Sequence, residues 1–481
     1  MNVISAIPHK TLLLATAVAI AACAPTHTAP ANPAVAVTAA ATAPQALTAA
    51  LDSIMAAAYP ADQPGAAAIV VQDGEVLLRQ GYGMADLELD VPMRPEYVFR
   101  IGSMTKQFTG AAILMLKQEG RLSLEDPLTR FLPDYPTDGR TVTVEQLLGH
   151  SSGIRSYTNM PEWNETIRED VSLEELIATF RDEPFDFEPG EDYSYNNSGY
   201  VLLGAIIEEV SGMSYEDFLR TRIFERLGME SSGYGNAARI TTNRIPGYSR
   251  QEDEWVNAEY FSMTQAHAAG ALLSSVDDMA RWDAAITRGA LLGESGWERA
   301  HTPIRLNDGR STRYGAGWGL GRIGHYETIE HGGGIDGFTV HALRVPDANL
   351  FVAVLTNADS PVTPPVQFAL RLADKVLGGV MDDPEEVPVD LERLEEYAGD
   401  FQFDDGYTFT ISVEETTLHW SVGEQRGELR PIGQDLFFDP DSGFRFRFDR
   451  EAGRVVAVVL EPRVGMPERA SRIDEEARVD P

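Results

Sequence analysis

Ser103 and Lys106 stand three residues apart at the start of a predicted helix. Apolar residues follow Gly102 at helical spacing, which predicts a core helix over residues 103–119 that ends at Gly120. Positions three apart share one face of a helix, so the Lys106 ammonium can reach the Ser103 hydroxyl. A buried lysine can lose its proton and act as a base, whereas an arginine cannot. The pair could therefore provide a serine nucleophile and its base.

Lysine is scarce in this chain, which makes Lys106 more informative. The sequence has 481 residues and 39 Lys plus Arg. The lysines among them are only Lys10, Lys106, Lys117 and Lys375. A Ser-x-x-Lys match alone still arises by chance about a quarter of the time. A capped core helix with a snorkelling lysine is the alternative, so other residues must agree.

Two further short motifs offer suitable chemistry. Tyr195 and Asn197 precede a predicted helix over residues 198–210, and they supply a phenol that can shuttle protons and an amide that can hold a carbonyl or the lysine. His331 is followed by two glycines on a predicted strand, where a substrate can approach the backbone closely. Taken singly, Tyr195 could be a core aromatic residue and His331 a turn histidine. The conjunction in order and spacing is much less probable by accident.

In order and spacing, these motifs and their flanks resemble the serine β-lactamase-related family, which includes class C β-lactamases, penicillin-binding D,D-peptidases, D-aminopeptidases and esterases. The similarity covers about residues 50 to 378, and as a set the motifs are highly specific. The matching segments are Gly81-Tyr82-Gly83 with Ala85-Asp86, Phe99 to Lys106, Leu147 to Gly153, Pro189-Gly190-Glu191, Tyr195 to Tyr200, Leu227-Gly228-Met229, Ala269-Gly270-Ala271 with Asp277 to Ala280, and His331 to Phe338.

The resemblance implies an acyl-enzyme mechanism. Ser103 would attack a carbonyl, with Lys106 and Tyr195 sharing the proton transfers. The backbone amides of Ser103 and Gly334 would form the oxyanion hole, with Gly333 beside them. Water would then release the acyl group. Neither a metal nor an organic cofactor is implied.

The same resemblance assigns substrate-binding roles to Asn197 and His331. Asn197 would orient the substrate and the lysine, and His331 would stand where many family members carry the lysine of Lys-Thr-Gly. A permanent cation there helps to bind a substrate carboxylate, whereas histidine is mostly neutral at pH 7. Asn196 and Asp336 depart from residues common in the family, which bears on the loops near the site.

Charge narrows the substrate class. The chain has 74 Asp plus Glu and a formal net charge of -35, which argues against nucleic-acid binding and disfavours anionic substrates. We therefore expect a hydrolase of small peptides, amides or esters, similar to D-amino-acid peptidases or esterases. The alternatives are a β-lactamase or D,D-carboxypeptidase, and a ligand-binding sensor that is acylated with little turnover.

The expected fold class is α+β, with the β-lactamase/transpeptidase-like arrangement that the resemblance implies. Residues 66–72 and 75–82 read as strands joined by a hairpin turn at Asp73-Gly74. Strand patterns return at 339–344 and 350–355, with amphipathic helices between. This order predicts one antiparallel sheet whose first and last strands pair, packed against helical layers. Five short alternating runs after residue 406 predict a small C-terminal antiparallel barrel or sandwich.

The N-terminal residues have the pattern of an export signal. Lys10 precedes an apolar run over residues 11–22, which is too short to span a bilayer. The run ends in Cys23, the only cysteine, in a setting that resembles the bacterial lipobox. This predicts a lipid-anchored envelope protein, and Ala24 favours the outer membrane facing the periplasm. An ordinary cleaved signal peptide is the alternative.

These observations predict the domain organisation. The predicted segments are a signal peptide (1–22), a lipidated cysteine with an Ala/Pro/Thr-rich tether (23–48), a serine hydrolase domain (49–379), an acidic linker (380–390) and a C-terminal β domain (391–475). The only expected membrane contact is the lipid anchor, and the only expected ligand is a small substrate.

Overall fold

The computed structural model describes residues 45–473 except 161, 252–253, 361–363, 382–383, 390, 404–407, 423–424, 441 and 465. All described residues fall within one unit of the chain, Val37–Pro481. The predicted signal peptide, Cys23 and most of the predicted tether lie outside the described residues. No helix in the described part of the chain is both long and apolar enough to cross a bilayer.

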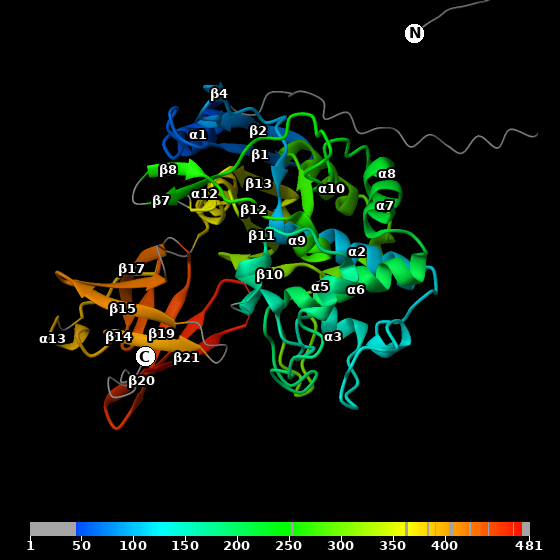
Figure 1. Cartoon of the computed structure of the whole chain (residues 1–481). Coiled ribbons are helices and arrows are strands. Elements are labelled where there is room, and N and C mark those ends of the chain that lie inside the picture. Colours follow the sequence, from blue (N-terminus) through cyan, green and yellow to red (C-terminus); the bar gives the residue numbers. More distant parts are fainter. Residues whose placement is uncertain are drawn as a thin grey trace, which may run out of the picture. The chain divides into compact units, whose positions relative to one another are not determined.

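A six-stranded antiparallel sheet is the framework of the hydrolase part of the chain (Figure 1). Its strands lie in the order β10, β11, β12, β13, β1, β2. Their bounds are β1 Ala66–Gln72, β2 Glu75–Tyr82, β10 Gly319–Ile323, β11 Tyr326–Ile335, β12 Phe338–Val345 and β13 Leu350–Thr356. The predicted pairing of the first strand with the last is confirmed, because β1 pairs with β13 from Ala66↔Thr356 to Gln72↔Leu350.

The predicted hairpin joins β1 to β2. Asp73 and Gly74 both have positive φ, of 51° and 79°, as a two-residue hairpin turn of this hand requires. Side chains of the buried strands alternate between two cores. Ile69 and Leu355 belong to one, and Val70 and Val354 to the other. The sheet is therefore covered by helices on both faces.

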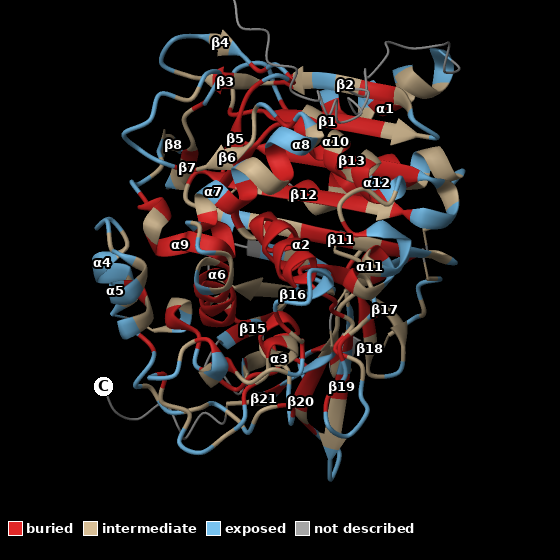
Figure 2. Cartoon of the chain, turned by 90° about the vertical axis from the view of Figure 1, so that its right-hand side faces the viewer, coloured by how far each residue is buried: buried red, intermediate tan, exposed pale blue. Residues whose placement is uncertain are grey.

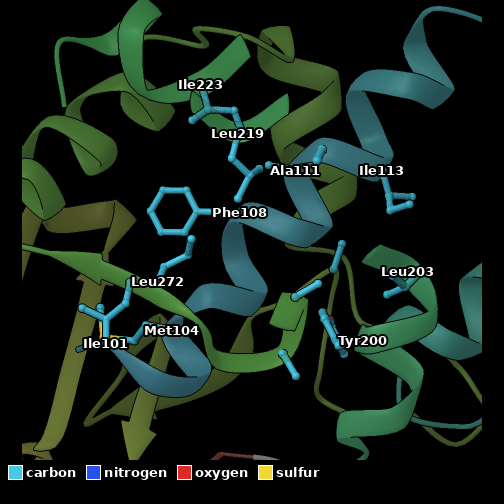
Figure 3. Packing of buried hydrophobic residues seen from close by; sticks show 14 of the residues in the cluster. Ile101, Met104, Phe108, Ala111, Ile113, Tyr200, Leu203, Leu219, Ile223 and Leu272 are labelled. Atoms are coloured by element: carbon cyan, nitrogen blue, oxygen red, sulfur yellow. The ribbon is translucent and has the colours of Figure 1, made fainter. Parts of the chain in front are cut away.

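Two helices, α1 (Gln45–Ala56) and α12 (Pro365–Leu377), cover one face. The other face packs against α10 (Val276–Thr287) and the larger helical body. At its centre, α2 (Thr105–Gln118) is buried from Thr105 to Leu116, as Figure 2 shows in red. Figure 3 shows Phe108 of α2 among apolar side chains that include Leu219 and Ile223. This burial fixes the position of the residues at the N-terminal end of α2.

The remaining helices and strands that precede the barrel strands complete the list of elements. The helices are α3 Val144–Leu148, α4 Trp163–Thr166, α5 Leu173–Ala178, α6 Asn197–Ser211, α7 Tyr215–Leu219, α8 Glu225–Leu227, α9 Met263–Gly270, α11 Gly293–Ala300 and α13 Leu391–Leu394. The single-turn and π segments are η1 Gly102–Met104, η2 Leu128–Arg130, η3 Tyr157–Asn159, η4 Arg220–Phe224 and η5 Pro346–Ala348. The small strands are β3 Met84–Asp86, β4 Val91–Pro92, β5 Phe99–Arg100, β6 Gly233–Tyr234, β7 Tyr248–Gln251, β8 Glu254–Asn257 and β9 Leu272–Ser274.

A closed antiparallel barrel forms the C-terminal part, which confirms the predicted architecture. Its strands are β14 Gly399–Phe403, β15 Thr408–Glu414, β16 Thr417–Val422, β17 Gln425–Gly433, β18 Leu436–Phe438, β19 Arg445–Glu451, β20 Arg454–Glu461 and β21 Glu468–Arg472. Pairing of Phe401 with Arg472 closes it between β14 and β21. Phenylalanines such as Phe401, Phe437 and Phe448 fill the interior. The domain boundaries given above remain predictions.

Candidate active site

Ser103 lies in η1, a one-turn 3₁₀ helix that leads directly into α2. The helix was expected to start at Ser103 and instead starts at Thr105. Gly102, the first residue of η1, has a positive φ of 47°, a conformation that strains any residue with a Cβ. Lys106 still faces the serine, and its Nζ is 3.0 Å from Ser103 Oγ.

Lys106 is fully buried, and its hydrogen-bond partners are neutral. Its Nζ donates to Asn197 Oδ1 at 2.7 Å and to the carbonyl oxygen of Ala269 at 2.9 Å, besides its contact with Ser103. Burial holds the pKa of Lys106 well below its usual value, because the charged form loses its hydration. The lysine is therefore suited to accept the Ser103 proton.

Tyr195 lies in the loop before α6, as predicted, and borders the same site. Its ring centroid is 4.8 Å from Lys106 Nζ. The residue remains 37% exposed and lines the larger cavity of the site, so an incoming substrate can reach it. Burial of the phenol raises its pKa, and a hydrogen bond with Ser103 opposes that shift. A protonated phenol beside Ser103 can donate a proton to a leaving group.

Asn197 is the first residue of α6, and both ends of its amide are held. Oδ1 accepts from Lys106, and Nδ2 donates to Thr158 Oγ1 at 3.0 Å. The backbone N–H of Asn197 donates to Ser156 Oγ at 3.2 Å. The preceding Asn196 caps α6 by accepting from the N–H of Gly199 at 2.7 Å. The amide of Asn197 therefore fixes the lysine in place.

His331 lies on β11 and is 8% exposed. Its Nδ1 is 2.5 Å from the carbonyl oxygen of Gly332, which can only accept, so Nδ1 carries the proton. Its Nε2 then accepts from the hydroxyl of Tyr314 at 2.7 Å. Burial lowers the pKa of His331 to about 3, and the nearby Lys106 contributes. A neutral imidazole therefore stands where the family resemblance suggested a cation in many members.

The predicted oxyanion segment is an open strand edge. The pairing of β10 with β11 ends at Gly319↔Glu330, and within the described residues no strand continues it beside 331–335. This edge lies against the serine turn, because a Cβ at Gly333 would come within 2.1 Å of the carbonyl oxygen of Ile101. A Cβ at Gly102 would likewise come within 3.0 Å of the Gly334 nitrogen. The structure therefore places the amides of Ser103 and Gly334 on adjacent segments.

Two cavities border these residues. The smaller, about 360 Å³, is lined by Ser103, Asn197 and Gly334, and also by Trp163 and Asp336. The larger, about 1120 Å³, contains Tyr195 and His331 in its wall. Each of the three predicted motifs, Ser-x-x-Lys, Tyr-x-Asn and His-Gly-Gly, therefore contributes at least one residue to the wall of these cavities. Their individual roles remain predictions.

Sequence reasoning assigned no role to His150, although its segment carried part of the family resemblance. The ring is buried, and Nδ1 accepts the backbone N–H of Asn196 at 3.0 Å. Its centroid lies 4.4 Å from that of Tyr195 and 4.5 Å from that of Tyr314. His150 also has a positive φ of 58°, which is uncommon for a residue other than glycine. His150 is therefore a positioning residue for the loop that carries Tyr195 and Asn197.

Replacing His150 by phenylalanine is expected to lower kcat/KM by about a hundredfold, since a shift of roughly 1 Å in a catalytic group can have that effect. The buried N–H of Asn196 would also lose its acceptor, which costs about 1 to 3 kcal/mol of unfolding free energy. His150→Asn is the matched variant, because asparagine tolerates positive φ and offers an acceptor oxygen. Steady-state rates and thermal unfolding measure both effects. Equal rates in the wild type and His150→Phe would contradict the assignment.

Within the described residues, no group of three or more His, Cys, Asp or Glu side chains is arranged to hold a metal ion. That the reaction needs neither metal nor organic cofactor remains a prediction. Cys23, the predicted lipidation site, lies outside the described residues.

A serine with a buried lysine beside it, next to the edge of an antiparallel sheet strand, is the arrangement expected of a serine hydrolase that works through an acyl-enzyme. Residues 51–375 match the family model for beta-lactamase, so the chain belongs to the beta-lactamase family. Its members include serine hydrolases of amides and peptides, and this chain is an enzyme of that class.

Individual relatives agree with this assignment. Penicillin-binding protein 4* of Bacillus subtilis (strain 168) is 29% identical over 399 residues, which are 77% of this chain and 86% of that protein. The structure of the octameric penicillin-binding protein homologue from Pyrococcus abyssi superposes with a TM-score of 0.63 at 27% identity, covering 89% of this chain and 99% of that chain. The structure of the D-amino acid amidase from Ochrobactrum anthropi SV3 complexed with L-phenylalanine amide superposes with a TM-score of 0.61 at 26% identity. The match covers 69% of this chain and 99% of that chain.

Proposed function

We propose that this protein hydrolyses small amides or peptides of D-amino acids that carry a free amino group. The observation that carries the proposal is the neutral, buried His331 beside the Ser103 and Lys106 pair. A lysine at that position would attract a substrate carboxylate, and this imidazole offers no such charge. The D-amino acid amidase among the structural neighbours supports the same substrate class.

The lining of the smaller cavity also favours a cationic substrate. Asp336 and Asp359 both contribute to its wall, next to the aromatic rings of Trp163 and Phe261. Burial raises the pKa of Asp336, as does the neighbouring Asp359, while Arg100 opposes the shift. An ammonium group in this cavity would relieve the repulsion between the two acidic groups. The aromatic rings suit an apolar side chain on the same substrate.

The geometry supports a two-step reaction. Lys106 takes the Ser103 proton as Oγ attacks the substrate carbonyl, and the amides of Ser103 and Gly334 stabilise the oxyanion. Tyr195 donates a proton to the leaving amine, and Lys106 returns the proton to the phenol. Water then attacks the acyl-serine, and its proton passes through Tyr195 and Lys106 to Ser103 Oγ, the reverse of the first step. The acid is released. Asn197 holds Lys106 in place throughout.

A substrate panel on one purified sample tests the proposal. The members are D-phenylalanine amide, its L-enantiomer, its N-acetylated form, a D-Ala-D-Ala peptide, a p-nitrophenyl ester and nitrocefin. We expect the highest kcat/KM for the free D-amide, with N-acetylation reducing it because the ammonium is lost. Asp336→Asn should reduce the difference in kcat/KM between the free and the N-acetylated D-amide, since a neutral amide would replace the carboxyl group.

Other outcomes of the panel identify the alternatives. The highest kcat/KM with nitrocefin would indicate a β-lactamase, and with the D-Ala-D-Ala peptide a D,D-carboxypeptidase. The highest value with the ester would indicate an esterase. A persistent adduct without turnover of any substrate would indicate an acylated sensor. The proposed specificity is contradicted by any of these four results.

We also propose that the enzyme works outside the cytoplasm, anchored by acyl chains on Cys23. Lys10, the short apolar run and the alanines before Cys23 support this placement. Labelled fatty acid should be incorporated into the full chain and should be absent from Cys23→Ser. Incorporation in both, or in neither, would contradict the anchor.

A further inference from the structure

One segment of the barrel contacts the hydrolase sheet beside the active site. It runs from Pro462 to Val464, directly after β20. Arg313 donates to the carbonyl oxygen of Arg463 at 2.7 Å and to that of Pro462 at 3.4 Å. The guanidinium of Arg313 therefore holds the backbone of this segment.

The side chain of Arg463 reaches in the opposite direction, onto β11. Its Nη1 donates to Glu330 Oε1 at 2.8 Å, and its Nη2 donates to the other carboxylate oxygen. Nη1 is also 3.2 Å from Thr328 Oγ1 and 3.2 Å from the carbonyl oxygen of Arg322. A two-pronged guanidinium–carboxylate contact fixes orientation as well as distance. Only 13% of the Arg463 side chain and 1% of the Glu330 side chain are exposed.

Glu330 has a second side-chain partner on the neighbouring strand. His341 Nε2 on β12 is 2.9 Å from Glu330 Oε2. Burial alone would raise the pKa of Glu330, but Arg463 and His341 hold it well below its usual range. The carboxylate is therefore charged, buried and fully engaged, and loss of Arg463 would leave much of that charge uncompensated.

Apolar packing completes the contact. Val464 lies over two glycines of β10, since a Cβ at Gly319 or Gly321 would come within 2.4 or 2.6 Å of its methyl groups. Neither glycine has positive φ, so close approach explains both. The segment is thus seated on β10 and β11 by shape as well as by charge.

The position of Glu330 along β11 gives the contact its consequence. Glu330 is the last residue of β11 that pairs with β10, and His331 is the next residue. From there to Ile335 the outer edge of β11 is open. We propose that Arg463 is a positioning residue for the reaction, which holds Glu330 and thereby fixes the open edge that carries His331, Gly333 and Gly334. The barrel is then a working part of the active site.

This inference rests on the proposed function for its substrate, so the experiment also measures the rate at which a p-nitrophenyl ester acylates Ser103, followed by the release of p-nitrophenol. Arg463→Met is compared with Arg463→Lys and with Arg447→Met, all as full chains. Arg447 is the matched control, because it forms ion pairs with Asp449 and Glu461 within the barrel and its side chain is 47% exposed. Thermal unfolding sets a temperature at which each variant is folded.

We expect Arg463→Met to lower kcat and the acylation rate by about a hundredfold with little change in KM, since a misplaced oxyanion strand affects the chemical step more than binding. Arg463→Lys should recover part of the rate, because a lysine keeps the charge but cannot form both contacts. Arg447→Met should resemble the wild type. A folded Arg463→Met with wild-type kcat and acylation rate would overturn the inference.

A double-mutant cycle separates positioning from simple attachment of the barrel. If Arg463 acts through Glu330, the rate losses of Arg463→Met and Glu330→Gln should be strongly non-additive in the double variant. Independent, additive losses would overturn the inference. A wild type that turns over no D-amino-acid amide but is acylated at Ser103 contradicts the proposed substrate only, and the acylation rates still decide the role of Arg463.

Discussion

Ser103→Ala is expected to lower kcat by about 10⁶-fold, the size of effect seen when a hydrolase loses its nucleophile. Among the described residues, Ser103 bears the only hydroxyl hydrogen-bonded to Lys106, whose other partners are an amide oxygen and a backbone carbonyl. Incubation with a fluorophosphonate or penicillin should add the mass of one acyl or phosphonyl group to the wild type. The intact mass of Ser103→Ala should not change.

Ser151→Ala is a suitable control for this experiment. Ser151 is 1% exposed, and its hydroxyl has no hydrogen-bond partner among the described residues, so its removal leaves none of their polar groups unsatisfied. We expect the rate and the adduct of this variant to match those of the wild type. An adduct of undiminished yield in Ser103→Ala would place the nucleophile elsewhere and refute the site.

The composition of the site could be predicted from the sequence because its residues are chemically distinctive. A lysine three positions after a serine, at the start of an apolar helix, was informative in a chain that otherwise uses arginine. The structure brings Lys106 to Ser103, Asn197 and Tyr195 as the motif order implied. The neutral state of His331 could only be expected in part, because the low pKa of its ring is caused by burial and by the nearby Lys106, which are properties of the folded chain.

Contacts between distant segments could not be predicted in the same way. The sheet pairing of β1 with β13 followed from apolar, strand-like runs at the two ends of the domain with helices between them. Strands β14, β18 and β21 were missed, because they are short or carry charged residues, as in Glu468–Arg472. Nothing in the sequence marks Arg463 among the arginines. Its significance comes from burial against Glu330, which is a property of the folded chain.

Lys106→Arg is the second substitution with a large expected effect. Arginine keeps the positive charge but cannot release its proton at any accessible pH, so the variant has no base for Ser103. We expect kcat/KM to fall by about 10²- to 10⁴-fold, the usual contribution of general acid–base catalysis. The larger guanidinium must also fit a fully buried site beside Asn197 and Ala269. Acylation rates measured by stopped flow on saturating substrate report the chemical step directly.

The pH dependence of the wild type and of Lys106→Arg separates loss of the base from poor packing of the larger guanidinium. Below the pKa of Lys106, which burial holds well under its usual value, the amine is protonated and cannot accept a proton. Wild-type kcat/KM should therefore fall as the pH falls through that pKa, and the residual activity of Lys106→Arg should lack this limb. Lys117→Arg, an exposed position of the same helix, should keep both the rate and the limb. An acid limb that persists unchanged in Lys106→Arg would mean that another group is the base.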